Sequence, residues 1–145
     1  MMIETSLYRV ALRFEGMKEK PGNQDEPFIL WALSLCGLGG HDETPWCSAF
    51  MNAICYVLGL SRSGSAAARS WLAVGTPVDI NAAQVGMDIV ITYREGSPTA
   101  GHVGAFAGYD GDRIKILGGN QGDMVNVRSF PLAVVLGIRR IQPKG

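Results

Sequence analysis

Histidine and cysteine are both scarce in this sequence. Among its 145 residues there are two histidines, His41 and His102, and three cysteines, Cys36, Cys47 and Cys55. The cysteines are odd in number and lack CxxC spacing, which argues against a disulfide framework and against a zinc cluster. We therefore predict at least one free thiol, no metal and no other cofactor.

The sequence also lacks an excess of charge of either sign and any long apolar run. Lys and Arg number 13 and Asp and Glu number 13, so no basic field attracts nucleic acid or anionic lipid. The longest uncharged run, 27–40, is too short and too broken by glycine to span a bilayer. The first residues lack the basic and then apolar build of a signal peptide. We expect synthesis in the cytoplasm, no nucleic-acid partner and no stable membrane insertion.

Hydrophobic residues, in contrast, make up 47% of the chain, and its length suits one domain spanning 1–145. Apolar residues recur at helical spacing in the first half, whereas β-branched residues alternate in the second half. These patterns predict helices at 5–17, 28–36, 45–58 and 66–74, and strands at 88–93, 102–109, 113–117, 124–128 and 134–141. The order predicts an α+β fold in which N-terminal helices pack on a C-terminal antiparallel sheet.

Cys47 lies at the predicted start of the third helix. Thr44 suits the N-cap position and Pro45 the first helical position, which makes Cys47 the third helical residue. The positive end of the helix dipole favours a thiolate and lowers the pKa of a cysteine placed there. Cys47 is therefore a candidate nucleophile. The alternative is a buried structural cysteine, because Cys47 shares an apolar helix face with Phe50 and Ile54.

A base for this nucleophile has to be one of the two histidines. His41 is next to Asp42 in a loop, where a solvated side chain is the simplest interpretation, whereas His102 opens a predicted strand. The Asp-Gly pair at 110–111 predicts a tight hairpin to the next strand. Pairing 109 with 113 places His102 opposite Asn120, and a shift of one residue favours Gln121 or Gly119 instead.

Three stretches together resemble a known family. They are Asp42-Glu43-Thr44-Pro45-Trp46-Cys47-Ser48-Ala49-Phe50, Gly101-His102-Val103-Gly104 and Leu117-Gly118-Gly119-Asn120-Gln121. They resemble the motifs of the CHAP group of cysteine, histidine-dependent amidohydrolases/peptidases, which is close to the NlpC-like peptidases. Stretches 19–22 and 68–72 also resemble small phage and bacterial members.

The resemblance implies a papain-like α+β fold and hydrolysis of amide bonds in the peptide part of peptidoglycan. By position, Cys47 is the nucleophile, His102 the base and Asn120 the residue that orients the histidine. The backbone N–H of Cys47 is a donor to the oxyanion. The substrate groove is the least specific part of the prediction: Gln121, Trp46 and Trp71 are candidates, although aromatic residues beside helices are more often core.

Two departures from the family limit the prediction. Gly86-Met87-Asp88 carries one residue more than the usual Gly-Asp before the first core strand. The Asp-rich calcium loop of some CHAP enzymes is also missing, so the resemblance adds no metal.

The leading functional interpretation is a phage-type endolysin. Such an enzyme acts on the cell wall, in the periplasm, after a separate membrane lesion releases it. Its partner is the peptidoglycan stem peptide, and we expect a monomer. Alternatives are a secreted antibacterial amidase toxin of the same chemistry, a non-catalytic wall-binding or tail-assembly module, and acyl transfer in place of hydrolysis.

Overall fold

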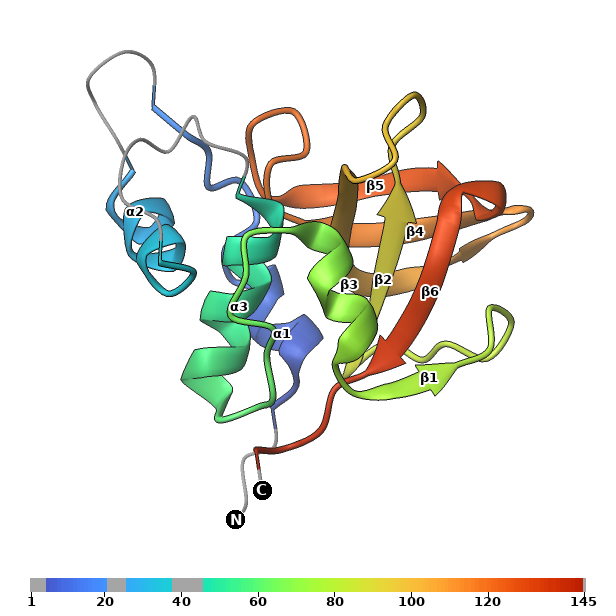
Figure 1. The fold of residues 1–145 in the computed structure, drawn as a ribbon, viewed down its shortest axis with the longest axis horizontal. Helices are drawn as coiled ribbons and strands as arrows, with labels where there is room; N and C mark the ends of the chain where they lie inside the picture. The colour runs from blue at the N-terminus through green and yellow to red at the C-terminus, as the bar shows by residue number, and fades with distance from the viewer. Residues whose placement is uncertain (1–4, 21–25, 38–45, 145) are drawn as a thin grey trace.

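The three α-helices and the 3-10 helix η1 come first along the chain and lie on one side of a single sheet. The computed structural model describes residues 5–20, 26–37 and 46–144. Figure 1 shows the helices together on the left and the sheet on the right. The helices are α1 (Leu7–Leu12), α2 (Pro27–Ser34), α3 (Cys47–Leu58) and the 3-10 helices η1 (Ala68–Ala73) and η2 (Leu132–Val134).

The sheet has six strands in the order β1-β6-β2-β3-β4-β5, and every neighbouring pair is antiparallel. Its central strands β2 and β3 bring Thr92 opposite His102. The strands are β1 (Thr76–Val78), β2 (Asp88–Tyr93), β3 (Gly101–Asp110), β4 (Arg113–Gly118), β5 (Asn126–Pro131) and β6 (Val135–Arg140).

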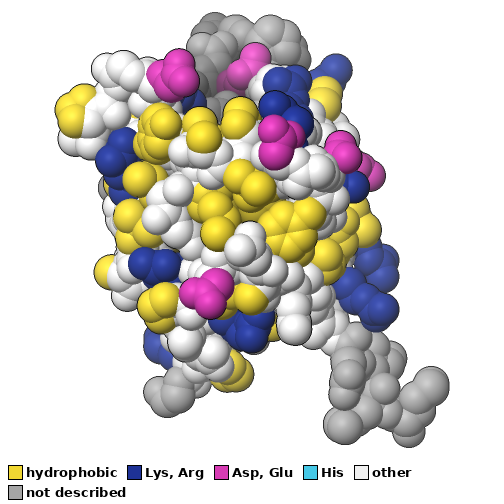
Figure 2. All heavy atoms as spheres, turned by 90° about the vertical axis from the view of Figure 1, so that its right-hand side faces the viewer, with side chains coloured by type: hydrophobic (Ala, Val, Ile, Leu, Met, Phe, Trp, Pro, Cys, Tyr) yellow, Lys and Arg dark blue, Asp and Glu magenta, His cyan; other side chains and the backbone are white. Residues whose placement is uncertain are grey.

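Two apolar clusters cover the two faces of the sheet. Because successive side chains of a strand point to opposite faces, Ile89 and Ile91 join the cluster under the helices, whereas Val90 joins the second cluster. The second cluster also contains Phe106, and Ile116 belongs to it from β4. Figure 2 views the molecule from the sheet side, where hydrophobic side chains gather across the middle and charged ones surround them.

Helix α3 runs through the main core. All of its residues from Cys47 to Cys55 are buried, and it ends at Gly59, whose φ of 68° is the left-handed conformation that glycine adopts readily. Such a helix is surrounded by protein rather than lying on the surface. The position of its first residue is therefore fixed by packing on the sheet.

The predicted α+β class is confirmed, with differences at the element ends. The third helix begins at Cys47 with Trp46 as its N-cap, so Cys47 is the first helical residue and not the third. Thr44 and Pro45 lie outside the described residues. The predicted helix at 66–74 is a 3-10 helix, and the short strand β1 was not predicted because Thr76–Val78 is too brief to show a period.

Within the described ranges, no helix combines the length and apolar character that a membrane span requires.

Candidate active site

Cys47 is held where α3 meets the sheet. Its side chain is only 7% exposed, and backbone N–H groups of Val103 and Ser48 interact with its sulfur. Val103 directly follows His102 on β3. The thiol therefore lies against the strand segment that carries the histidine.

Burial and the helix start act on the Cys47 thiol in opposite directions. Burial raises its pKa, and the N–H groups of Val103, Ser48 and Cys47 itself, together with the charge of Arg94, lower it. The net direction is upward, which corrects the prediction of a lowered pKa. The predicted donors at the helix start are present, but loss of hydration of the thiolate outweighs them.

His102 is fixed by two contacts. Its Nε2 lies 2.7 Å from Oε1 of Gln121, and its ring stacks on Phe130 with centroids 5.5 Å apart. Burial lowers the pKa of His102, the hydrogen bond to Gln121 raises it, and the charge of Arg94 lowers it. The neutral imidazole is favoured, which is the form able to accept a proton.

The amide of Gln121 determines which ring nitrogen carries the proton. Its Nε2 donates to Asn126 O at 2.8 Å, to Asn126 Oδ1 at 2.9 Å and to Ile116 O at 3.2 Å. The amide nitrogen is thus committed to three acceptors, and the oxygen faces the histidine. Nε2 of His102 therefore donates to Gln121, and in the neutral ring Nδ1 is the basic nitrogen.

Gly118 makes the contact between His102 and Gln121 sterically possible. A Cβ at Gly118 would lie 2.9 Å from Oε1 of Gln121 and 3.2 Å from Nε2 of His102. At the next position, a Cβ on Gly119 would lie 2.4 Å from the Trp46 ring. Because it has no Cβ, Gly118 leaves room for the His102–Gln121 pair. For the same reason Gly119 leaves room for the ring of Trp46, the residue before Cys47.

Gln121, and not Asn120, makes the hydrogen bond to the histidine. Near the turn the strands pair Asp110 with Arg113, a β-bulge follows between 106 and 108, and the paired register of β3 and β4 ends at 105 and 117. Asn120 has a φ of 59° and has left the extended conformation. Extrapolating strand pairing to Asn120 was therefore wrong, because the chain turns before it.

Trp46 and Trp71 do not form a groove. Their side chains are 1% and 0% exposed, and both belong to the main core. Nε1 of Trp71 donates to Oγ of Ser48 at 2.8 Å, and that hydroxyl donates to Ser65 O at 2.6 Å. Trp71 thus ties the first turn of α3 to η1.

A cavity of about 490 Å³ opens beside the histidine. It is lined by His102, Gln121 and Asn120 and by charged and aromatic side chains from the end of β2 and from β5, among them Arg94 and Phe130. The guanidinium of Arg69 holds the loop between β2 and β3 by donating to Ala100 O and Ser97 O. Gln121, predicted as a groove residue, does line this cavity.

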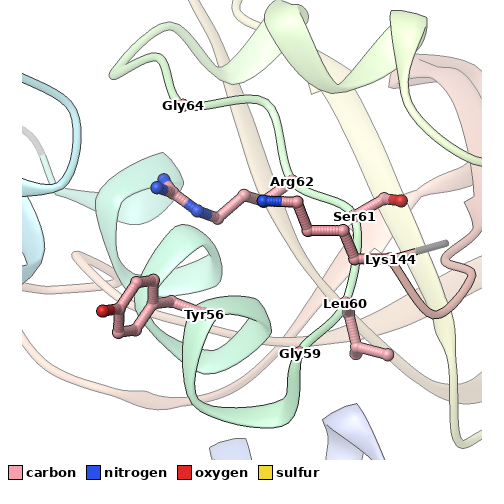
Figure 3. A pocket seen from close by; sticks show the side chains of 7 residues that line it. All are labelled: Tyr56, Gly59, Leu60, Ser61, Arg62, Gly64 and Lys144. Carbon is pink, nitrogen blue, oxygen red and sulfur yellow. The ribbon is translucent and has the colours of Figure 1, made fainter.

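A second cavity, of about 450 Å³, lies at the C-terminal end of α3 (Figure 3). Arg62 lies over the Tyr56 ring, 5.6 Å from its centroid, and donates to Leu35 O and Asn52 Oδ1. Lys144 extends into the same region. No histidine lines this cavity, whereas His102 lines the first one, although Cys47 does not. The candidate site is therefore the cavity beside His102.

The other two cysteines have no such setting. Burial raises the pKa of Cys55 to about 12 and also raises that of Cys36. All three thiols are free, and no group of three or more metal-ligating side chains occurs among the residues that the structure describes.

Sequence reasoning missed three contributors to the site: Asn126, Phe130 and Arg94. Asn126 lies five residues after Gln121 across a turn, and the amide-rich character of that turn was an available signal. Phe130 and Arg94 give no local signal, because their contact with the site depends on where β5 and the end of β2 lie.

The fold is similar to a solved structure. An NlpC/P60 family protein from Bacillus cereus superimposes with a TM-score of 0.57 at 16% identity; the match covers 93% of this chain and 39% of that chain. This chain thus spans well under half of that protein. No family model and no curated protein matches the sequence. The likeness supports an NlpC-like fold.

Proposed function

We propose that this chain is a cysteine amidohydrolase that cleaves amide bonds in the peptide part of peptidoglycan. The observation that carries the proposal is the hydrogen bond of 2.7 Å between His102 and Gln121, on a strand whose next residue, Val103, offers its backbone N–H to the sulfur of Cys47. A nucleophile, a base and a residue that orients the base are the parts that covalent amide hydrolysis needs. The NlpC-like fold and the family motifs around Cys47 and His102 agree with this chemistry.

In the proposed reaction, the Cys47 thiol and the His102 imidazole are both uncharged at the start. Nδ1 of His102 takes the proton of the Cys47 thiol as the sulfur attacks the scissile carbonyl carbon. The oxyanion accepts a hydrogen bond from the backbone N–H of Cys47, which has no intrahelical partner because it belongs to the first turn. The C–N bond then breaks, and the imidazolium gives its proton to the leaving amine, which leaves a thioester.

Water completes the cycle. Neutral His102 takes a proton from water as the oxygen adds to the thioester carbonyl, the C–S bond breaks, and the thiolate recovers its proton from the imidazolium. Gln121 keeps Nε2 protonated throughout, so that Nδ1 remains the atom that exchanges protons. In this proposal Gln121 takes the orienting role that the family motif gave to Asn120.

The family motifs favour a phage-type endolysin with a papain-like arrangement of cysteine helix and histidine strand. Either an endopeptidase or an N-acetylmuramoyl-L-alanine amidase would use the same residues, and the fragments that it releases distinguish the two. A secreted amidase toxin shares the chemistry. The buried polar contacts of Gln121, which serve to orient a base, favour an enzyme over a non-catalytic wall-binding module.

The test is digestion of purified peptidoglycan with the full chain, followed by mass spectrometry of the soluble fragments. We expect new free amino and carboxyl ends at one bond type, and no release above background by Cys47→Ala. Cys36→Ala is the matched control and should keep full activity. Equal release by wild type and Cys47→Ala would contradict the assignment, and release of no fragments by the wild type would contradict the proposed substrate.

A further inference from the structure

The cavity at the C-terminal end of α3 is built by two segments that are far apart in the chain. Its lining residues lie between 56 and 64, except for Lys144. Backbone hydrogen bonds join the two segments: Lys144 N–H donates to Gly59 O at 2.9 Å, and Ser61 N–H donates to Gln142 O at 2.9 Å. The backbone therefore fixes Lys144 at the edge of the cavity.

The guanidinium of Arg62 is held in place through one of its nitrogens. Nη1 donates to Leu35 O and to Asn52 Oδ1, each at 3.3 Å. Asn52 is fully buried, and its Oδ1 also accepts from Gly64 N–H at 2.7 Å, so this acceptor is itself fixed. The other two nitrogens, Nε and Nη2, have no hydrogen bond to any residue that the structure describes. They remain for a ligand, on a guanidinium that is already positioned.

Lys144 adds a second positive charge to the same cavity. Figure 3 shows its side chain extending toward Arg62. Its ammonium group has no hydrogen bond or ion pair with a described residue, and none of the residues that line the cavity is acidic. The chain as a whole is neutral, with 13 basic and 13 acidic residues, so this pair of cations is a local excess. Like charges repel, and an anion bound between them removes that repulsion.

The end of α3 does not account for these two cations. Helix C-terminal carbonyls attract positive charge, but here backbone donors occupy two of them. Gly59 N–H donates to Tyr56 O at 3.2 Å, and Leu60 N–H donates to Cys55 O at 2.9 Å. Within the described ranges, the side chains of Arg62 and Lys144 make no hydrogen bond to a backbone carbonyl of α3. Both cations are therefore available to a ligand.

We propose that this cavity binds a phosphate group between Arg62 and Lys144. A phosphate monoester carries a charge of about −1.5 to −2 at neutral pH, which matches two cations without an acidic neighbour, whereas a carboxylate would neutralise only one of them. Arg62 supplies a planar pair of donors and Lys144 a compact point charge, and both kinds of donor suit phosphate oxygens.

The ligand is inorganic phosphate or a small phosphate monoester, and the ring of Tyr56 is where the organic part of an ester would pack. This ring lines the cavity, and its outer surface is exposed. A volume of about 450 Å³ accommodates a small ester. The site is separate from the cavity beside His102, so it stands or falls independently of the proposed amide hydrolysis.

Titration of the full chain with inorganic phosphate tests the site, with calorimetry for the affinity and NMR for the Arg62 Nε–H signal. Lys144→Gln should bind phosphate about 10-fold or more weakly, because hydrogen bonds between charged groups are the stronger ones. Lys144 is exposed, so this variant should fold. Lys115→Gln is the matched control, because it removes the same charge from β4, outside the cavity, and should keep the affinity. An unmoved Arg62 signal, or equal losses in the two variants, would overturn the site.

Acetate and phenyl phosphate test the charge of the ligand and identify its source. Acetate, which has one negative charge, should bind about 10-fold or more weakly than inorganic phosphate, and equal binding would contradict a site for phosphate. Phenyl phosphate that binds more tightly than inorganic phosphate, with the gain lost in Tyr56→Ala, would support the site and identify a monoester as its ligand. Equal affinities for the two phosphates would support the site with inorganic phosphate as its ligand.

Discussion

Two cavities of the molecule, one beside His102 and one at the C-terminal end of α3, differ in the partners of their basic side chains. The cavities are similar in size, at about 490 and 450 Å³, and each is lined by two basic side chains. At the C-terminal end of α3, Arg62 is bonded to Leu35 O and Asn52 Oδ1. In the cavity beside His102, Arg94 and Arg128 have no such partners among the described residues. An arginine that is hydrogen-bonded within the protein stabilises the fold, whereas an arginine without protein acceptors is available to a ligand.

The largest expected effect comes from the histidine that only one cavity contains. His102→Gln should lower kcat for peptidoglycan by about 1000-fold or more, because it removes the proton acceptor of the thiol. Tyr56→Phe at the other cavity should leave kcat unchanged. Release of dye-labelled fragments measures both. An equal loss in the two variants would show that the cavities cannot be told apart by chemistry.

Gln121→Leu should have the next largest effect, a fall in kcat of about 10-fold or more with a smaller change in KM. Leucine fills similar space but neither accepts from His102 nor donates to Asn126, so the imidazole loses the contact that sets its tautomer. Asn120→Ala is the comparison at the neighbouring position and should have the weaker effect. A stronger effect of Asn120→Ala would restore Asn120 to the orienting role. Steady-state kinetics on one soluble fragment measures both.

Arg62→Gln and Arg94→Gln compare an arginine that is hydrogen-bonded within the protein with one that lines the cavity beside His102. Arg62→Gln should lower the free energy of unfolding by about 1–2 kcal/mol, because two acceptors lose a charged donor, and should leave kcat/KM unchanged. Arg94→Gln should leave the free energy of unfolding nearly unchanged and lower kcat/KM. Urea unfolding and kinetics on the same preparations give both values. If both variants lost stability and kept activity, the distinction between the cavities would fail.

The smallest expected effect is a shift in pH dependence. Because the pKa of His102 is lowered, kcat/KM should rise with pH along a limb whose midpoint lies below the usual histidine pKa of about 6.5. Arg94 contributes to the lowering, so Arg94→Gln should move this limb to higher pH. NMR titration of the imidazole in the Cys47→Ala variant checks the assignment. A midpoint above 6.5 would contradict a base that is neutral at rest.

The same shift predicts the sign of a stability change. Below pH 6.5 the unfolded chain binds a proton at His102 that the folded chain does not, so the free energy of unfolding should fall as pH falls through this range. His102→Gln should remove that part of the pH dependence.

The sequence by itself determined the α+β order of elements and the presence of a free thiol, and it proposed Cys47 and His102 as candidate site residues. These conclusions rest on local information: apolar periodicity, glycine at helix ends, and the scarcity of histidine and cysteine. The end of α3 at Gly59 was predictable because only a few residues adopt its backbone conformation readily.

Only the tertiary structure decided which residue is hydrogen-bonded to the histidine and which cavity the histidine lines. A bulge before Gly108 and the positive φ of Asn120 place Gln121 on the imidazole, and neither can be read from strand spacing. Burial, which depends on every packed neighbour, reversed the predicted direction of the Cys47 pKa shift. Burial and long-range register are sums over residues far apart in the chain, so a local pattern cannot supply them.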